Sequence, residues 1–99
     1  MEHLEGTYEF QYIHNNQDLT SNLRKFRNNI AMSQRQVASI LDIERSTYTY
    51  YEHGKTLPNI FTLLKISKIF KVHIFYLLAK DGYNLYIKNS NSDNAQDAT

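Results

Sequence analysis

The sequence of 99 residues has a formal net charge of +1, no cysteine and 41% hydrophobic residues. Its length fits one compact domain and excludes two. The lack of cysteine excludes disulfides and thiolate metal sites, and the longest apolar run, residues 74–79, is far shorter than the roughly 20 residues that cross a bilayer. We therefore expect a cytoplasmic protein that has no membrane partner.

Charge is spread unevenly along the chain. Ten of the 11 basic residues lie within residues 24–80, where only three acidic residues oppose them, whereas residues 1–18 and 81–99 are acidic. A basic segment of this kind attracts a phosphate backbone even when the whole chain is nearly neutral. An ordinary solvated surface has the same balance, so charge alone leaves nucleic-acid binding and plain solvation equally open.

The two ends of the chain have the alternating pattern of strands. In residues 6–15 aromatic and polar side chains alternate, which predicts a short strand in an N-terminal extension covering residues 1–18. After a turn signal, residues 81–88 alternate in the same way and predict a second strand. Residues 89–99 have no apolar side chain larger than alanine, and we expect them to be a disordered tail.

Residues 19–80 predict a domain of five short helices joined by brief turns. Thr20 or Ser21 is the expected N-cap of the first helix, whose apolar residues then recur at intervals of three and four. Ser33 is the expected N-cap of the second, and Gln36, three positions later, completes a capping box.

A tight turn at Asp42 leads into the third predicted helix. Glu44 is expected to offer its carboxylate to the first free amides of that helix, and Gly54 to end it. Asn59 begins the fourth helix and His73 the fifth. The side chains expected to face the core include Leu23, Phe26, Val37, Ala38, Ile40, Leu41, Tyr48, Ile60, Leu63, Leu64, Phe70 and Leu77.

The second and third predicted helices carry the pattern that points to function. The turn between them is too short for them to lie side by side, so they must cross steeply, as in a helix-turn-helix. In that motif the N-terminal end of the second helix of the pair enters the major groove of DNA. The candidates for base reading are Arg45, Ser46, Thr49 and Tyr50. The candidates for phosphate contacts are Gln34, Arg35, His53, Lys55, Thr56 and Asn59.

Each of these candidates has a plainer alternative. Arg45 suits the two acceptors of guanine, but it would also serve as a phosphate contact or a solvated charge. The hydroxyls of Ser46 and Thr49 suit several bases, and Tyr50 fits both a groove contact and ordinary surface. Gln34, at the positive end of its helix, suits a phosphate. Double-stranded DNA is thus the predicted partner. The sequence leaves open which candidates read bases and which contact phosphates.

One set of residues spread over residues 19–78 follows the pattern of a known family. They are Leu23, Arg24, Arg27, Ser33, Gln34, Val37, Ala38, Arg45, Ser46, Thr47, Tyr51, Glu52, Gly54, Lys55, Pro58, Leu63, Leu64, Lys65, Val72, Leu77 and Leu78. With them the chain resembles the phage repressor and Cro family of helix-turn-helix proteins, also called the xenobiotic-response-element family. The resemblance implies an all-α, five-helix repressor-like domain that regulates transcription as a dimer on a palindromic operator. It also implies a structural ion pair between Arg27 and Glu52.

Three positions in the turn and the third predicted helix depart from the family's pattern. Asp42 stands where relatives usually have glycine in the turn, although aspartate tolerates a left-handed backbone better than most residues. Tyr48 replaces a branched aliphatic residue, and Tyr50 occupies a position that commonly reads a base. The operator sequence therefore does not follow from the resemblance.

Phe61, Phe75 and Tyr76 are aromatic at positions where relatives commonly carry acidic residues. Soluble monomers rarely leave such surface bare, so we expect a homodimer partner, or the two terminal strands, to cover it. The same residues keep a second class of function open. In that class, an antitoxin-like or sensor-binding module uses the fold mainly to hold a protein partner.

The sequence has no pattern of an enzyme or a metal site. The four histidines are scattered without carboxylates at ligand spacing, and the three glycines form no phosphate-binding loop. No serine lies in the strand-turn-helix pattern of a nucleophile elbow. We therefore expect no catalytic residues, no cofactor and no metal.

Overall fold

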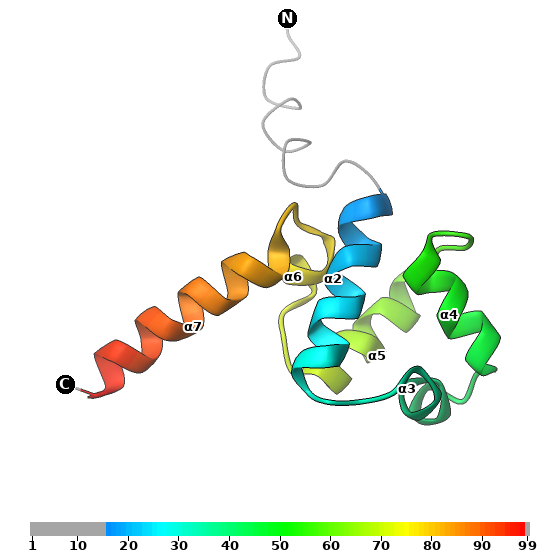
Figure 1. The fold of residues 1–99 in the computed structure, drawn as a ribbon, viewed down its shortest axis with the longest axis horizontal. Coiled ribbons are helices and arrows are strands. Elements are labelled where there is room, and N and C mark those ends of the chain that lie inside the picture. Colours follow the sequence, from blue (N-terminus) through cyan, green and yellow to red (C-terminus); the bar gives the residue numbers. More distant parts are fainter. Residues whose placement is uncertain (1–15, 99) are drawn as a thin grey trace, which may run out of the picture.

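The computed structural model describes the backbone of residues 16–98 and the side chains of residues 16–90. Six helices follow one another in this part of the chain, and no strand occurs in it (Figure 1). They are α2 (Asn16–Asn29), α3 (Gln34–Leu41), α4 (Arg45–His53), α5 (Ile60–Phe70), α6 (Ile74–Leu78) and α7 (Gly82–Ala98). The predicted all-helical class is confirmed, whereas the strand predicted within residues 6–15 lies outside the described residues.

Five of these helices, α2 to α6, share one core. Helices α2 and α5 bury apolar side chains at intervals of three and four, as amphipathic helices do, α3 buries three apolar residues, and α4 and α6 each bury one. The buried members are Leu19, Leu23, Phe26, Val37, Ala38, Leu41, Tyr48, Leu63, Ile66, Phe70 and Leu77. Tyr48 is the largest of the fully buried side chains, so the core accepts an aromatic ring at this departure from the family pattern.

Three apolar residues that we expected in the core are exposed instead. Ile40 is 57% exposed, Ile60 54% and Leu64 41%. Consecutive helical residues are about 100° apart, so Leu64 lies to one side of the stripe that begins at Leu63. Ile60 precedes that stripe in the first turn of α5, and Ile40 lies to one side of the buried stripe of α3.

Side-chain caps define the starts of three helices. The Gln36 amide donates to Ser33 Oγ at 3.0 Å and the Ser33 amide donates to Gln36 Oε1 at 2.8 Å, so the predicted capping box of α3 is confirmed. Asn59 accepts from the Thr62 amide at 2.9 Å to cap α5. His73 Nδ1 accepts from the Phe75 amide at 3.0 Å to cap α6.

Two of the predicted caps are wrong. Glu44 precedes α4 but makes no side-chain hydrogen bond to it, so only its backbone carbonyl, which accepts from the Tyr48 amide at 3.2 Å, takes part. Helix α2 begins at Asn16, ahead of Thr20 and Ser21. Thr20 is buried within the helix and its hydroxyl donates to the Gln17 carbonyl at 3.0 Å.

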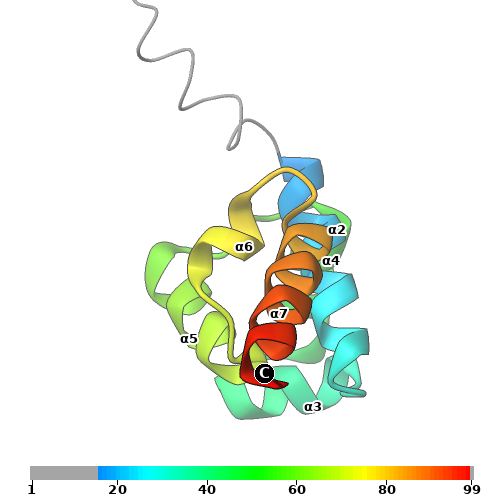
Figure 2. The ribbon, with the colours of Figure 1, turned by 90° about the vertical axis from the view of Figure 1, so that its left-hand side faces the viewer.

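The strand predicted for residues 81–88 is wrong, because residues 82–88 belong to helix α7. The helix continues to Ala98, whereas the sequence predicted a disordered tail over residues 89–99, of which residue 99 lies outside the described residues. Tyr83 and Tyr86, which are three positions apart, both pack edge-on against Phe26, with ring centres 5.1 Å and 5.3 Å away. This shared contact requires a helical face, since strand residues three apart point to opposite sides. Toward its C-terminus α7 leads away from the other helices in Figure 1, and in Figure 2 it points toward the viewer, in front of them.

A buried asparagine joins α7 to the rest of the domain. Asn22 Nδ2 donates to the carbonyls of Leu77 at 3.0 Å and Ala79 at 2.8 Å, and Asn22 Oδ1 accepts from the Tyr83 amide at 3.1 Å. These three bonds provide partners for two backbone carbonyls at the end of α6 and for one backbone amide at the start of α7. Gly82 makes the close approach possible, since a Cβ atom there would lie 1.9 Å from the Tyr76 carbonyl oxygen.

Candidate nucleic-acid interface

Helices α3 and α4 are joined by the tight turn that the sequence predicts. Asp42 ends α3 in the left-handed region, with φ 59° and ψ 47°, and its amide donates to the Ser39 carbonyl at 3.1 Å. The Ile43 amide then donates to the Ala38 carbonyl at 3.0 Å. Aspartate thus supplies the backbone conformation that usually requires glycine, and the chain turns within a few residues into α4.

Helix α4 has one face fixed to the domain and one face open. Tyr48 and Glu52 are buried, whereas Arg45, Ser46 and Tyr50 are exposed. Three of the four base-reading candidates therefore lie on the open face. The fourth, Thr49, is half-buried, and its hydroxyl donates to Gln34 Oε1 at 2.8 Å.

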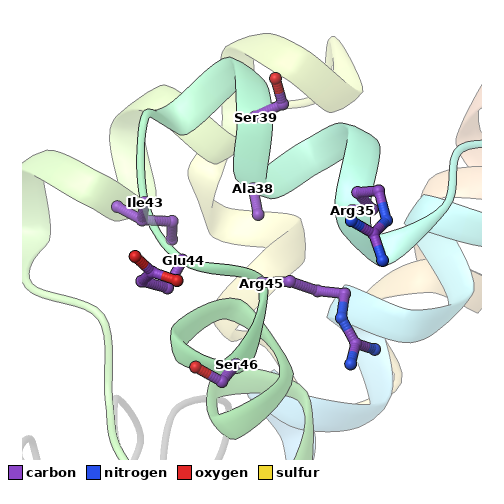
Figure 3. Close-up of a pocket in the computed structure, with 7 residues that line it drawn as sticks. All are labelled: Arg35, Ala38, Ser39, Ile43, Glu44, Arg45 and Ser46. Carbon is purple, nitrogen blue, oxygen red and sulfur yellow. The ribbon is translucent and has the colours of Figure 1, made fainter.

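The open face of α4 borders a hollow that α3 also lines. Figure 3 shows Arg35 and Ser39 of α3 together with Arg45 and Ser46 of α4 around this hollow. The side chains of Arg35 and Arg45 extend toward the same side of it, and the carboxylate of Glu44 also lines it, so the hollow has two positive charges and one negative charge. The sequence reasoning missed Ser39. Its spacing of four from Arg35, on the same exposed side of α3, is the signal that would have found it.

The phosphate-contact candidates surround α4. Arg35, His53, Lys55, Thr56 and Asn59 are all exposed. The ammonium of Lys55 lies 5.1 Å from the centre of the Tyr50 ring, a cation–π distance that keeps the two side chains together at the end of α4. Gln34 differs from the others, because it is half-buried and its side chain hydrogen-bonds within the protein.

The ion pair expected between Arg27 and Glu52 is present beneath the open face. Arg27 Nε lies 2.6 Å from Glu52 Oε2 and Nη2 lies 3.0 Å from Oε1, so the guanidinium binds both carboxylate oxygens. Arg27 also donates to the Met32 carbonyl at 2.9 Å, and Arg24 donates to the backbone carbonyl of Glu52. Helix α4 is therefore tied to α2 at its buried side.

These bonds determine the ionisation of Glu52. Burial, the largest influence, opposes the charged form, but the bonds from Arg27, supported by the bond from Gln34, outweigh it and lower the pKa of Glu52 from its usual value of 4.5. Burial is also the main reason that the pKa of Tyr48 is raised, and its buried hydroxyl has no hydrogen-bond partner within the described residues. Tyr48 thus stays neutral beside an ionised carboxylate.

The three dimer-surface candidates do not form one surface. Phe61 lies in the first turn of α5 and is 71% exposed, whereas Phe75 and Tyr76 lie on α6, which follows the last turn of α5. Tyr76 is already covered: its ring packs edge-on against Tyr86 at 5.4 Å, and its hydroxyl accepts from Asn89 Nδ2 at 3.0 Å. Helix α7 therefore partly covers Tyr76, one of the three aromatic residues that we assigned to a partner or to terminal strands.

Phe61 has other apolar neighbours, which sequence reasoning did not connect with it. Leu57, Ile60 and Leu64 are exposed, and they lie four positions before, one before and three after Phe61. We call these four residues the α5 face. Of these four residues, Ile60 and Leu64 are the ones that the sequence pattern predicts in the core, and only their exposed fractions show that they face outward.

Within residues 16–98 no helix is long and apolar enough to cross a membrane. The same part of the chain has no group of three or more histidine, aspartate or glutamate side chains arranged to hold a metal ion.

A family model and two similar proteins all place the chain among helix-turn-helix proteins. A family model described as Helix-turn-helix matches residues 23–77, more than half of the chain. The chain is 41% identical over 59 residues to the uncharacterised HTH-type transcriptional regulator YqaE of Bacillus subtilis (strain 168), covering 60% of this chain and 51% of that protein. It is also 41% identical over 56 residues to the SPbeta prophage-derived uncharacterised HTH-type transcriptional regulator YonR of the same bacterium, covering 57% and 52%. The chain thus spans about half the length of these two relatives.

A solved structure has the same fold. The crystal structure of the clp gene regulator ClgR from Corynebacterium glutamicum matches with a TM-score of 0.63, covering 82% of this chain and 86% of that chain at 16% identity. At such low identity the likeness shows the fold alone. The match over residues 23–77, together with the tight turn between α3 and α4 and the Arg27–Glu52 pair, shows that the chain belongs to the helix-turn-helix family of the phage repressor and Cro type.

Proposed function

We propose that this protein is a sequence-specific DNA-binding transcriptional regulator, acting as a repressor, that lays α4 in the major groove. The observation that carries the proposal is the two-sided character of α4. Its inner side is held by the buried Tyr48 and Glu52, while Arg45, Ser46 and Tyr50 are exposed on the other side. A helix held in this way offers its N-terminal residues to base edges, and Arg45 suits the O6 and N7 acceptors of guanine.

The surroundings of α4 suit the phosphate backbone. Arg35 lies at the start of α3, where the helix dipole adds to its positive charge. Lys55 and Thr56 follow the last turn of α4, and His53 ends it. Contacts from both sides of a groove would fix the position of α4 on the duplex, leaving sequence choice to the open face. Occupying the groove blocks other proteins from the same site, which is the physical basis for repression.

A homodimer through the α5 face completes the proposal. The α5 face comes soon after Lys55 and Thr56 in the chain, so a second copy bound to it would lie next to the DNA-contacting loop. Two copies joined at this point would bring their α4 helices toward the same side of a duplex, with half-sites about one helical turn, roughly 34 Å, apart. Burial of four exposed apolar side chains supports the association.

Selection of bound sequences from a random DNA pool tests the proposal directly. We expect this selection to enrich one palindromic sequence. The affinity of the protein for that sequence should fall steeply as the salt concentration rises, because binding to phosphates releases counterions. Failure to enrich any sequence, or an affinity unchanged between low and high salt, would contradict DNA reading by α4.

The dimer is tested separately by light scattering at tens of micromolar protein. We expect a dimeric mass for the unaltered protein and a monomeric mass for Phe61→Glu. Lys25→Ala is the matched control, since it changes the net charge by the same amount at an exposed position on α2. A monomeric mass for the unaltered protein would rule out the homodimer, and a dimeric Phe61→Glu would rule out this face.

A further inference from the structure

The side chain of Gln34 joins the start of α3 to α4 at two points. Thr49 Oγ1 donates to Gln34 Oε1 at 2.8 Å, and Gln34 Nε2 donates to Glu52 Oε1 at 3.0 Å. The amide orientation is chemically defined, because an ionised carboxylate only accepts hydrogen bonds and must therefore face the NH₂ group. Thr49 and Glu52 are three positions apart and so share one side of α4. We call these two bonds the Gln34 clamp.

The clamp is anchored to the body of the domain. Its Glu52 end is held by Arg27, which binds both carboxylate oxygens and also donates to the Met32 carbonyl. A chain of hydrogen bonds therefore runs from Thr49 through Gln34 and Glu52 to α2. Two attachment points along one side of a helix resist its rotation about its own axis, which a single contact would permit.

The clamp also uses the hydroxyl proton of Thr49. A threonine hydroxyl has one proton to donate, and in this structure it goes to Gln34. Thr49 is half-buried, unlike Arg45 and Ser46, which are exposed. The geometry separates Thr49 from the side chains that are free to contact bases.

We propose that Gln34 and Thr49 are positioning residues that set the rotation of α4, and that base selection belongs to Arg45, Ser46 and Tyr50. This inference rests on the proposed DNA-reading function. Successive helical residues are about 100° apart on one rigid rod, so a rotation of α4 moves all three readers together. Loss of the clamp therefore weakens every base contact at once, whereas loss of a reader relaxes one position.

Three variants test this division of roles. Thr49→Val keeps the shape of the side chain and removes its hydroxyl, and Thr49→Ser restores the hydroxyl. Ser46→Ala removes the hydroxyl of an exposed reader on the same helix and serves as the matched comparison. Affinity is measured for the selected operator, for all its single-base variants and for unrelated DNA, with thermal melts of the free proteins alongside.

We expect Thr49→Val to bind the operator about tenfold more weakly, the loss of one net hydrogen bond, with unrelated DNA bound as before. Mismatch penalties should shrink at all contacted positions, Thr49→Ser should recover them, and Ser46→Ala should change one position. Relaxation at one position by Thr49→Val would identify Thr49 as a reader and overturn the proposal. A lowered melting temperature with unchanged operator affinity would also overturn it, because it would show a purely structural role.

A second measurement needs no DNA. Residual dipolar couplings of the α4 amides report the orientation of this helix relative to α2 in the free protein. We expect them to change in Thr49→Val and to return in Thr49→Ser, and unchanged couplings would overturn the clamp. Because this readout is independent of binding, failure of the clamp and failure of the proposed function are distinguishable.

Discussion

Arg27 of α2 and Glu52 of α4 form a two-bond ion pair, with Nε 2.6 Å from Oε2 and Nη2 3.0 Å from Oε1, and the Glu52 side chain has 0% exposure. The pair links the first described helix to the helix that we propose reads DNA. It therefore connects the stability of the domain to the geometry of the interface.

Removing only Arg27 from this pair should strongly destabilise the folded protein. In Arg27→Met the Glu52 carboxylate would stay buried without its main partner, and we expect the free energy of unfolding to fall by about 3–5 kcal/mol. Urea unfolding followed by circular dichroism measures the change. In the double variant Arg27→Met, Glu52→Leu, apolar side chains fill the space and most of the stability should return. A double variant no more stable than Arg27→Met would contradict this account.

The lowered pKa of Glu52 predicts an acid-sensitive fold. The unfolded chain has the ordinary glutamate pKa near 4.5, above the folded value, so between the two pKa values the unfolded state binds more protons. Stability contributed by Glu52 is therefore complete above about pH 4.5 and is lost as pH falls through the folded pKa. We expect urea midpoints to fall less steeply below this pH in the Arg27→Met, Glu52→Leu variant than in the unaltered protein. Parallel acid profiles would show that Glu52 is not responsible.

Gly82 should be intolerant of a side chain. A Cβ atom would lie 1.9 Å from the Tyr76 carbonyl oxygen and 3.0 Å from Asn22 Nδ2, so Gly82→Ala must push α7 away from its junction. We expect a loss of about 2 kcal/mol or more, which lowers the melting temperature by roughly 8 °C or more in a domain of this size. Asn84→Ala, at an exposed position on the same helix, is the control and should melt nearly as the unaltered protein does. Equal melting of the two variants would contradict the close packing at Gly82.

Arg45→Ala and Lys55→Ala should weaken DNA binding in different ways. Arg45→Ala is expected to reduce discrimination at one base pair by about 1–3 kcal/mol, because a bidentate contact is lost. Lys55→Ala should weaken all sequences alike and reduce the slope of log affinity against log salt by about one. Titrations of both variants with the operator, its single-base variants and unrelated DNA measure these effects. Uniform weakening by Arg45→Ala would reassign Arg45 to the backbone, and a change at one base with Lys55→Ala would reassign Lys55 to base reading.

Local features of the sequence were sufficient for much of the fold. Ser33 and Gln36 predict the start of α3 because both partners of the capping box lie within one turn. Asp42 predicts the turn because its left-handed conformation depends on its own side chain and its immediate neighbours. The same reasoning fails at Leu64 and Ile60, since a helical pattern reports which residues share a side but not how far the rest of the protein covers that side.

The sequence by itself determined that α2 to α6 form helices and that a tight turn joins α3 to α4. It also determined that Arg45, Ser46 and Tyr50 lie on the outer side of α4. These features follow from periodicity, caps and turns, which act between near neighbours. Only the tertiary structure decided that residues 82–98 form a helix and that Thr49 faces Gln34. The alternation in residues 81–88 also fits a helix that buries Tyr83 and Tyr86 on Phe26, and that ring lies more than fifty residues earlier in the chain. Contacts over such separations depend on how all the helices pack, which no local pattern specifies.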